Sequence, residues 1–332
     1  MDEIALNKIK SVYIKNFKSV KSVMLQDCRR INVLIGRPNV GKSNILEALA
    51  LFDVPYMVNS VSKSLRNLVR IENTAELFHN GVYTTPIEVL ADENKLVVTR
   101  LQNNGLSVDV SAKEDVTKYI FSSSLNLTTK REPTVLPDIL AYFFPKHFVA
   151  ESSNVGFLLP PFGSNLMETV ANLPELKANL AEMLHGYGLK MMFDSGSQEI
   201  KAMRENGLDM FLVPFSSLAD SLQRLIFYKA AIESNQDKVI CFEEPEAHTF
   251  PPYISNIVNG IIASDRNQFF ITTHSPYVMS SLLESAGDDL AVYVVDMKDN
   301  TTIVERLAEN QLQEAYDNGM DMFYNLEAYL SK

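Results

Sequence analysis

The sequence is poor in cysteine: only Cys28 and Cys241 occur, far apart in the chain. Two scattered cysteines cannot form a disulfide framework or a four-ligand zinc site, so we expect a reducing, cytoplasmic location. No run of about 18 uncharged apolar residues occurs, so no membrane-spanning helix is expected. The N-terminal MDEIALNKIK is charged from its second residue and lacks an apolar core, so no secretory signal is expected.

Positive charge is also scarce, and the formal net charge is -11. This balance argues against a broad basic surface for non-specific DNA binding. Some lysines do gather near the N-terminus, namely Lys8, Lys10, Lys15, Lys18 and Lys21. We interpret them as solvated charges flanking a strand, which leaves DNA binding open.

Low-complexity tracts, internal repeats and sustained heptads are absent, so no coiled-coil arm is expected. Apolar runs alternate with helical patterns at both ends of the chain, which predicts a mostly parallel sheet. Residues 86–110 read as an antiparallel β meander, and residues 134–190 as mostly helical. The predicted class is therefore α/β, a single head with an N-terminal lobe (1–133), a mainly helical insertion (134–215) and a C-terminal lobe (216–332).

A glycine-rich segment lies between the apolar run INVLI and the helix-like run NILEALALF, and it fits G-x-x-x-x-G-K-[ST]. Its glycines let successive N–H groups form an anion nest, and the following helix adds its N-terminal dipole. Lys42 supplies a point charge for the β- and γ-phosphates of a nucleotide, and the Ser43 hydroxyl is a ligand for Mg²⁺. The predicted nucleotide-binding residues are Gly36, Arg37, Pro38, Asn39, Val40, Gly41, Lys42, Ser43 and Asn44.

Two carboxylates, Glu243 and Glu244, end a second apolar strand, VICF. Paired acids at the end of a buried strand are costly unless a cation or hydrogen bonds compensate. In P-loop enzymes the first acid serves Mg²⁺, usually through water, and the second orients and deprotonates the attacking water. Glu243 is therefore the predicted metal-side acid and Glu244 the predicted general base. The alternative is an ordinary strand end running into a solvated loop.

The next predicted strand, QFFITT, is followed by His274. If it runs parallel to the acidic strand, His274 lies at the carboxyl edge of the sheet, where ligands bind in α/β folds. A neutral imidazole there can hydrogen-bond the γ-phosphate or the attacking water. The competing interpretation is a structural histidine, which we keep for the other four histidines.

Together these segments resemble the ABC-type ATPase heads of the SMC and RecF group and, more closely, the OLD-like AAA ATPases of bacteria. The resemblance is carried by IKSVYIKNFKSVKSV, INVLIGRPNVGKSNILEAL, CFEEPEAHTFPP and FFITTHSP, which span almost the whole chain in the family's order. It implies that two heads sandwich two MgATP between them, giving a homodimer or a higher oligomer. A signature segment of one head then caps the γ-phosphate that the other head holds.

The stretch that matches this signature is Ser217–Arg224 (SLADSLQR), in which Ser221 is the predicted donor to the opposite phosphate. The first residue of the stretch and Asp220 also suggest a loose capping box. The family's glycines are missing here, Glu243 stands where aspartate is usual, and no glutamine occurs between the P-loop and Arg100. These departures predict slow turnover.

The resemblance leaves the effector open. The stretch after His274 is too short for the Toprim nuclease domain of full OLD proteins, so we expect that domain to be absent. The first hypothesis is an ATPase that regulates a separate effector, a nuclease, in bacterial antiphage defence or DNA maintenance. The second is an ATP-locked oligomeric scaffold that holds a toxin, with incidental hydrolysis. A GTPase has least support, because Asn94-Lys95 lacks the aspartate that reads guanine.

Overall fold

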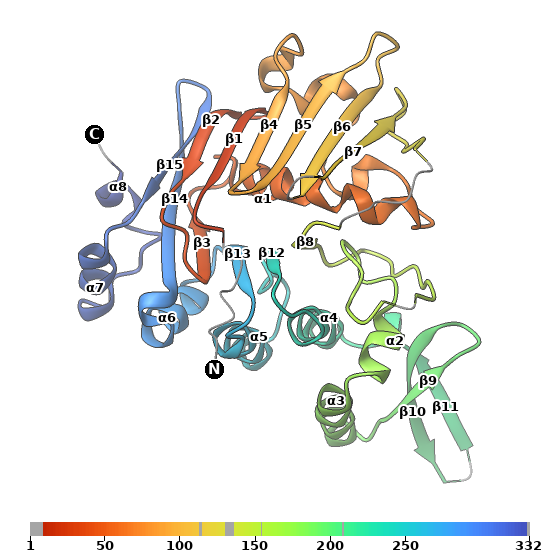
Figure 1. The fold of residues 1–332 in the computed structure, drawn as a ribbon. Helices are drawn as coiled ribbons and strands as arrows, with labels where there is room; N and C mark the ends of the chain where they lie inside the picture. Colours follow the sequence, from red (N-terminus) through yellow and green to blue (C-terminus); the bar gives the residue numbers. More distant parts are fainter. Residues whose placement is uncertain (1–8, 113–114, 130–135, 154, 208, 331–332) are drawn as a thin grey trace, which may run out of the picture. The chain divides into compact units, whose positions relative to one another are not determined.

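The computed structural model describes residues 9–112, 115–129, 136–153, 155–207 and 209–330, and it divides into two compact units (Figure 1). Unit 1 comprises Met1–Ala141, Asp237–Glu244 and Arg266–Lys332, and unit 2 comprises Tyr142–Gln236 and Pro245–Asp265. The units interleave along the chain, whereas the expected lobes follow one another. The expected lobe boundary at residues 133–134 and the lysine Lys8 lie outside the described residues.

The central sheet of unit 1 has the strand order β15-β14-β3-β13-β12-β8. Its strands are β3 (Ile31–Ile35), β8 (Ile139–Tyr142), β12 (Val239–Glu243), β13 (Gln268–Thr272), β14 (Leu290–Lys298) and β15 (Thr301–Arg306). β3 lies between β13 and β14 and is parallel to both, and β12 is parallel to β13. All positions of β3 and β13 are buried, as expected for strands covered on both faces. The carboxyl ends of β3, β12 and β13 therefore share one edge.

The second sheet of unit 1 is antiparallel and has the order β2-β1-β4-β5-β6-β7 (Figure 1). Its strands are β1 (Val12–Phe17), β2 (Val20–Leu25), β4 (Ile87–Ala91), β5 (Asn94–Arg100), β6 (Leu106–Ala112) and β7 (Asp115–Phe121). β4 alternates between buried and half-buried positions, so one face packs inward. The predicted meander is confirmed in β4, β5 and β6, and the α/β class with mixed sheets is confirmed as well.

Helix α1 (Lys42–Ala50) contacts β1 of one sheet and β12 and β13 of the other, so it lies between the two sheets of unit 1. Ile45, Leu46 and Leu49 on this helix are fully buried. The other helices of unit 1 are η1 (Leu51–Val58), η2 (Leu65–Asn67), η3 (Thr74–Leu77), η4 (His79–Gly81), α6 (Pro276–Ser285), η6 (Gly287–Asp289), α7 (Glu309–Asp317) and α8 (Leu326–Tyr329). None of the helices in the described part of the chain is long and apolar enough to cross a membrane.

Unit 2 combines helices with a small antiparallel sheet of order β11-β10-β9. Its elements are α2 (Leu166–Ala171), α3 (Pro174–Gly186), β9 (Lys190–Asp194), β10 (Glu199–Asn206), β11 (Asp209–Pro214), η5 (Phe215–Ser217), α4 (Asp220–Ser234) and α5 (Pro251–Ala263). α4 contacts α2, α3 and α5, and it buries Leu222, Leu225 and Ile226.

Four regions of strand escape the sequence patterns. The first is β8, which lies within the stretch 134–190 that was expected to be mostly helical. β2 follows β1 through a turn without glycine, in which Lys18 adopts a positive φ angle of 49°, and Asn16 near the end of β1 has a φ angle of 58°. β7 carries mostly exposed and half-buried residues, so it shows little apolar alternation. β9 and β10 are rich in Lys, Met and Glu, which favour helices in isolation, and pairing with neighbouring strands decides their structure.

Candidate nucleotide site

The glycine-rich segment forms a tight loop between β3 and α1. Gly36 has φ 154°, and a Cβ atom built on it would lie 2.1 Å from the Val295 carbonyl oxygen. Gly41 has φ 105°, and its Cβ would lie 2.1 Å from Thr302 Oγ1. Only glycine fits either place, because a side chain would clash and the backbone is left-handed. No side chain caps the start of α1, so its first-turn N–H groups suit phosphate oxygens.

Lys42 is buried beside this loop, with 5% of its surface exposed. Its Nζ donates hydrogen bonds of 2.8 Å to the carbonyl oxygens of Gly36 and Arg37. Burial lowers the pKa of Lys42 from 10.5 to about 8, although the nearby carboxylates of Glu244 and Glu243 oppose that shift. The ammonium group is therefore charged at neutral pH and held by the loop whose phosphate site it serves.

A chain of hydrogen bonds braces the phosphate loop from β15. Asn44 Nδ2 donates to Ser19 Oγ at 2.6 Å, and Ser19 Oγ lies 2.7 Å from Thr302 Oγ1. Thr302 Oγ1 in turn donates to the Val40 carbonyl at 2.9 Å. Thr302 is 1% exposed, so its hydroxyl cannot exchange this partner for water. The loop thus depends on residues from opposite ends of the chain.

The first acid at the end of β12, Glu243, forms an ion pair with Arg70. Arg70 Nε also donates to Glu47 at 2.8 Å, and Glu47 pairs with Lys18. Glu47 is 2% exposed, so its carboxylate needs these two cations. The pairing holds Glu243 beside Arg70, and Glu243 does not line the cleft described below.

The second acid, Glu244, has a left-handed backbone with φ 41°. Its N–H donates to the Thr272 carbonyl at 3.0 Å and lies 3.2 Å from Thr272 Oγ1, so β13 holds it in this conformation. A non-glycine residue with positive φ is strained, and such strain clusters at functional sites. The side chain is 40% exposed and can reach a ligand.

His274 follows β13 and faces Glu244. Its Nε2 lies 3.4 Å from Glu244 Oε1. Burial and the charge of Lys42 lower the pKa of His274 below its usual value, and Glu244 opposes the shift. The imidazole is therefore mostly neutral at pH 7, when it can both donate and accept a hydrogen bond.

One cleft of about 410 Å³ in unit 1 brings most of these side chains together. Its lining residues are Lys18, Pro38, Asn39, Gly41, Lys42, Ser43, Asn44, Glu47, Arg70, Glu244 and His274. The predicted residues Lys42, Ser43, Glu244 and His274, which come from three separate segments, thus line the same cleft. The predicted loop residues Gly36, Arg37 and Val40 do not line this cleft.

Sequence reasoning missed three charged residues of this cleft: Lys18, Glu47 and Arg70. Glu47 carried a usable signal, because it is an acid inside the otherwise apolar run ILEALAL, and a buried acid needs a cation. Arg70 carried none, since it reaches the cleft only through the fold of the segment after η2.

The donors around the cleft fit a magnesium ion bound together with phosphates. Mg²⁺ prefers oxygen ligands and usually takes only one or two from the protein, with the rest from water and phosphate. The Ser43 hydroxyl and the Glu244 carboxylate line the same cleft, and Glu243 is next to it. Among the described residues, no group of three or more His, Cys, Asp and Glu could hold a metal ion by itself.

The signature-like stretch belongs to unit 2 and differs from its prediction. α4 begins at Asp220 with Ala219 as its N-cap and no side-chain cap, so the predicted capping box is wrong. Ser217 lies in the short helix η5, which precedes α4. Gln223 Nε2 donates to the Leu218 carbonyl at 2.7 Å, between the two helices. Ser221 Oγ donates to the His248 carbonyl at 3.1 Å and accepts from the Phe250 N–H at 3.2 Å.

Comparisons with known proteins agree with the nucleotide cleft. Residues 8–136 match a family model described as "AAA ATPase domain", and residues 120–280 match one described as "AAA domain, putative AbiEii toxin, Type IV TA system". The chain is 24% identical over 323 residues to an ATP/GTP phosphatase of Helicobacter pylori, a match that covers 80% of this chain and 85% of that protein.

Solved structures of SMC heads are similar to this chain at low identity. An Smc head bound to the C-winged helix domain of ScpA matches with a TM-score of 0.49 and 15% identity, over 92% of this chain and 99% of that chain. The SMC head domain from Thermotoga maritima matches with a TM-score of 0.43 and 15% identity, over 91% and 99%. The chain is thus similar to AAA ATPase domains and to an ATP/GTP phosphatase, and these similarities agree with a nucleotide site in the cleft.

Proposed function

We propose that the cleft of unit 1 binds MgATP and hydrolyses it slowly, with Glu244 as general base. The observation that carries this proposal is the shared cleft of Lys42, Ser43, Glu244 and His274. A phosphate-binding lysine, a metal-binding hydroxyl, a carboxylate and a neutral imidazole are the groups that phosphoryl transfer to water requires.

In this mechanism each side chain has one task. Lys42 binds the β- and γ-phosphates, and the N-terminus of α1 adds backbone N–H donors. Glu244 accepts a proton from the attacking water, and neutral His274 hydrogen-bonds that water or the γ-phosphate. A magnesium ion, held by Ser43 and through water by Glu243, would neutralise charge on the phosphate oxygens. Arg70 fixes Glu243 for this role, because the two are already paired.

The proposed biological unit is a homodimer, or a higher oligomer, in which ATP lies between two heads. The effector is a separate protein, a nuclease, and the setting is bacterial antiphage defence or DNA maintenance. The family resemblance supports the dimer. The description of the second family model names a toxin of a Type IV TA system, which favours a setting with a second protein.

A specific observation favours the alternative, an ATP-locked scaffold that holds a toxin. The Ser221 hydroxyl is engaged with His248 and Phe250 of its own unit, so it is a poor donor to a phosphate on another head. Weak capping by the second head would slow hydrolysis and leave ATP mainly as an assembly signal.

The dimer is tested by light scattering of the Glu244→Gln protein with and without MgATP. ATP should double its mass, because the variant binds ATP without consuming it. A mass that stays monomeric at saturating ATP would contradict the proposed dimer. The ATP turnover of the wild-type protein, measured under the same conditions, separates the two hypotheses. The regulator must hydrolyse ATP, whereas the scaffold need not.

The separate effector is tested by incubating pure protein with ATP, Mg²⁺ or Mn²⁺, and linear, nicked or single-stranded DNA. No cleavage is expected. Cleavage that disappears with Asp321→Asn but persists with Glu244→Gln would contradict the proposal, because it would reveal a second catalytic centre in the segment between α7 and α8.

A further inference from the structure

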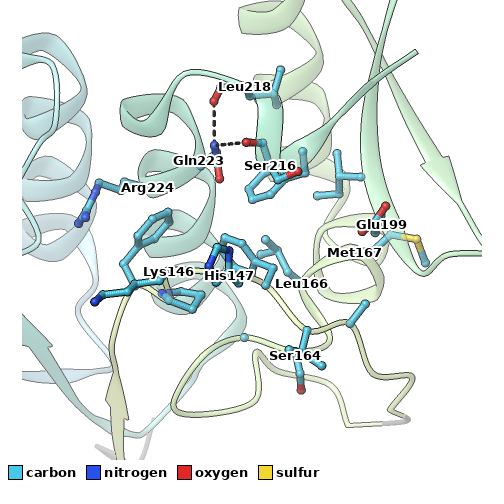
Figure 2. Close-up of a pocket in the computed structure, with 18 of the residues that line it drawn as sticks. Lys146, His147, Ser164, Leu166, Met167, Glu199, Ser216, Leu218, Gln223 and Arg224 are labelled. Atoms are coloured by element: carbon cyan, nitrogen blue, oxygen red, sulfur yellow. Dashed lines mark hydrogen bonds between the residues drawn. The ribbon is translucent and has the colours of Figure 1, made fainter. Parts of the chain in front are cut away.

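Unit 2 contains a cavity of about 730 Å³ that the nucleotide cleft does not involve (Figure 2). Its walls come from the loop Phe144–Ala150, the start of α2, the start of β10 and the start of α4. All of these segments belong to unit 2. The volume is in the range of small-molecule binding sites, about 300–1,000 Å³.

One wall of the cavity is aromatic. The ring centroids of Phe148 and Phe215 are 5.0 Å apart, and those of Phe144 and Phe148 are 5.5 Å apart, with both pairs edge to face. Phe144 and Phe148 are only half-buried, so their rings keep exposed surface in the cavity. Leu166 and Met167 of α2 add aliphatic surface and are nearly fully buried. Such a wall suits a flat apolar ring, since aromatic faces stack well on one another.

Positive charge lies along one side of this wall. Figure 2 shows Arg224 and Lys146 on the same side of the cavity. The Arg224 guanidinium stacks on Phe144 with its central carbon 4.3 Å from the ring centroid, and its Nε donates a hydrogen bond of 2.9 Å to Asp220. Lys146 is exposed and forms no ion pair with a described residue. A planar guanidinium and a lysine favour a phosphate or a carboxylate.

The opposite side of the cavity offers hydrogen-bond acceptors. Glu199, at the start of β10, is exposed there, and Figure 2 shows it across the cavity from Arg224 and Lys146. A carboxylate accepts hydrogen bonds only, so it selects N–H or O–H groups on a ligand. It also repels a polyanion, which disfavours a nucleoside triphosphate in this cavity.

We propose that this cavity binds a nucleoside monophosphate. The base would stack on Phe148, its N–H groups would face Glu199, and the single phosphate would face Lys146 and Arg224. An aliphatic ligand would leave the cationic side and Glu199 without partners, and an inorganic anion would leave the aromatic wall uncovered.

The cavity wall also contains Leu218, Asp220, Gln223 and Arg224, which belong to the signature-like stretch. An occupant would therefore contact the start of α4 and bias its position. The consequence, that a monophosphate alters the rate of ATP turnover, rests on the proposed function, whereas binding to the cavity does not.

Binding is tested by calorimetry with AMP, GMP, CMP and UMP on the full chain carrying Lys42→Ala, which removes the phosphate loop as a competing site. At least one monophosphate should bind with a Kd below about 1 mM. Its nucleoside should bind about tenfold more weakly, because it lacks the charge that Lys146 and Arg224 bind. Binding of none of the four would overturn the proposal.

Matched variants locate the site. Phe148→Leu keeps apolar volume but removes the ring, and it should weaken binding of the monophosphate about tenfold. Lys146→Gln removes one of the two charges, so it should weaken binding of the monophosphate and reduce its preference over the nucleoside. The controls are Phe211→Leu and Lys63→Gln, both at exposed positions outside the cavity, and they should bind normally. Unchanged affinity in Phe148→Leu and Lys146→Gln would overturn the proposed site.

Turnover of the wild-type protein, measured with and without the monophosphate that binds, tests the link to α4. If the monophosphate changes the turnover rate of the wild type but not that of Phe148→Leu, the link between the cavity and α4 is supported. If the Lys42→Ala protein binds the monophosphate but the wild type hydrolyses no ATP, the cavity proposal stands and the proposed function fails.

Discussion

The nucleotide cleft of unit 1 and the signature-like stretch of unit 2 use their polar groups in opposite ways. In the cleft, the side chains of Lys42, Glu244 and His274 face one open space, and the backbone of Glu244 is strained to achieve this. In the stretch, Ser221 is bonded on both sides to the loop that leads into α5. The cleft is arranged for a ligand, whereas the stretch is satisfied by its own unit.

The two regions also differ in their glycine content. Gly36 and Gly41 remain in the phosphate loop, where no other residue fits. The signature-like stretch has no glycine, and the Ser221 hydroxyl forms hydrogen bonds with the backbone of His248 and Phe250.

The largest contrast between the two regions should come from Lys42→Ala. Removing the ammonium group should weaken ATP binding by about 10²-fold or more, because no other described cation takes its place between the loop carbonyls and the phosphates. Calorimetry with MgATP measures this, and circular dichroism checks the fold. Equal affinity in variant and wild type would remove the site assignment.

The brace from β15 to the phosphate loop should matter less, and Thr302→Val tests it. The variant loses the hydrogen bond to the Val40 carbonyl, so KM for ATP should rise about tenfold while kcat changes little. Thr302→Ser keeps the hydroxyl and should restore KM. A loss confined to kcat, or no rescue by serine, would mean that the brace does not shape the binding site.

The lowered pKa of Lys42 predicts that ATP affinity depends on pH, with an effect similar to or smaller than that of Thr302→Val. Because that pKa is lowered to about 8, free Lys42 loses its proton as pH rises through 8, and bound phosphates must restore the charge. ATP affinity should therefore fall by up to about tenfold per pH unit above 8, with proton uptake visible as a buffer-dependent binding enthalpy. Residual binding by Lys42→Arg, which stays charged, should not change between about pH 7 and pH 9.

The smallest effect should come from Ser221→Ala. Its hydroxyl serves the loop of residues 245–250, so ATP turnover should change less than about threefold, while the free energy of unfolding falls by about 1 kcal/mol. Turnover and chemical denaturation measure the two quantities. A hundredfold loss of turnover with unchanged stability would restore Ser221 as a donor to nucleotide.

Sequence patterns predicted the parts of this molecule that depend on local chemistry. The strand, loop and helix around Gly36–Ser43 and the strands before Glu243 and His274 have strong apolar patterns and fixed spacing. The parts that depend on tertiary pairing were missed: β9 and β10 are rich in helix-favouring residues, and Arg70 reaches Glu243 across a long stretch of chain. Whether Glu243, Glu244 and His274 have the proposed roles stays a prediction.

The central claim, that this cleft hydrolyses ATP with Glu244 as base, is tested by phosphate release at saturating MgATP for wild type, Glu243→Gln and Glu244→Gln. Glu244→Gln should bind ATP as tightly as wild type. Its turnover rate should fall by about 10²-fold or more, the usual scale for a lost general base. Glu243→Gln should instead shift the Mg²⁺ dependence. Normal turnover in Glu244→Gln, with the block appearing in Glu243→Gln, would contradict the account.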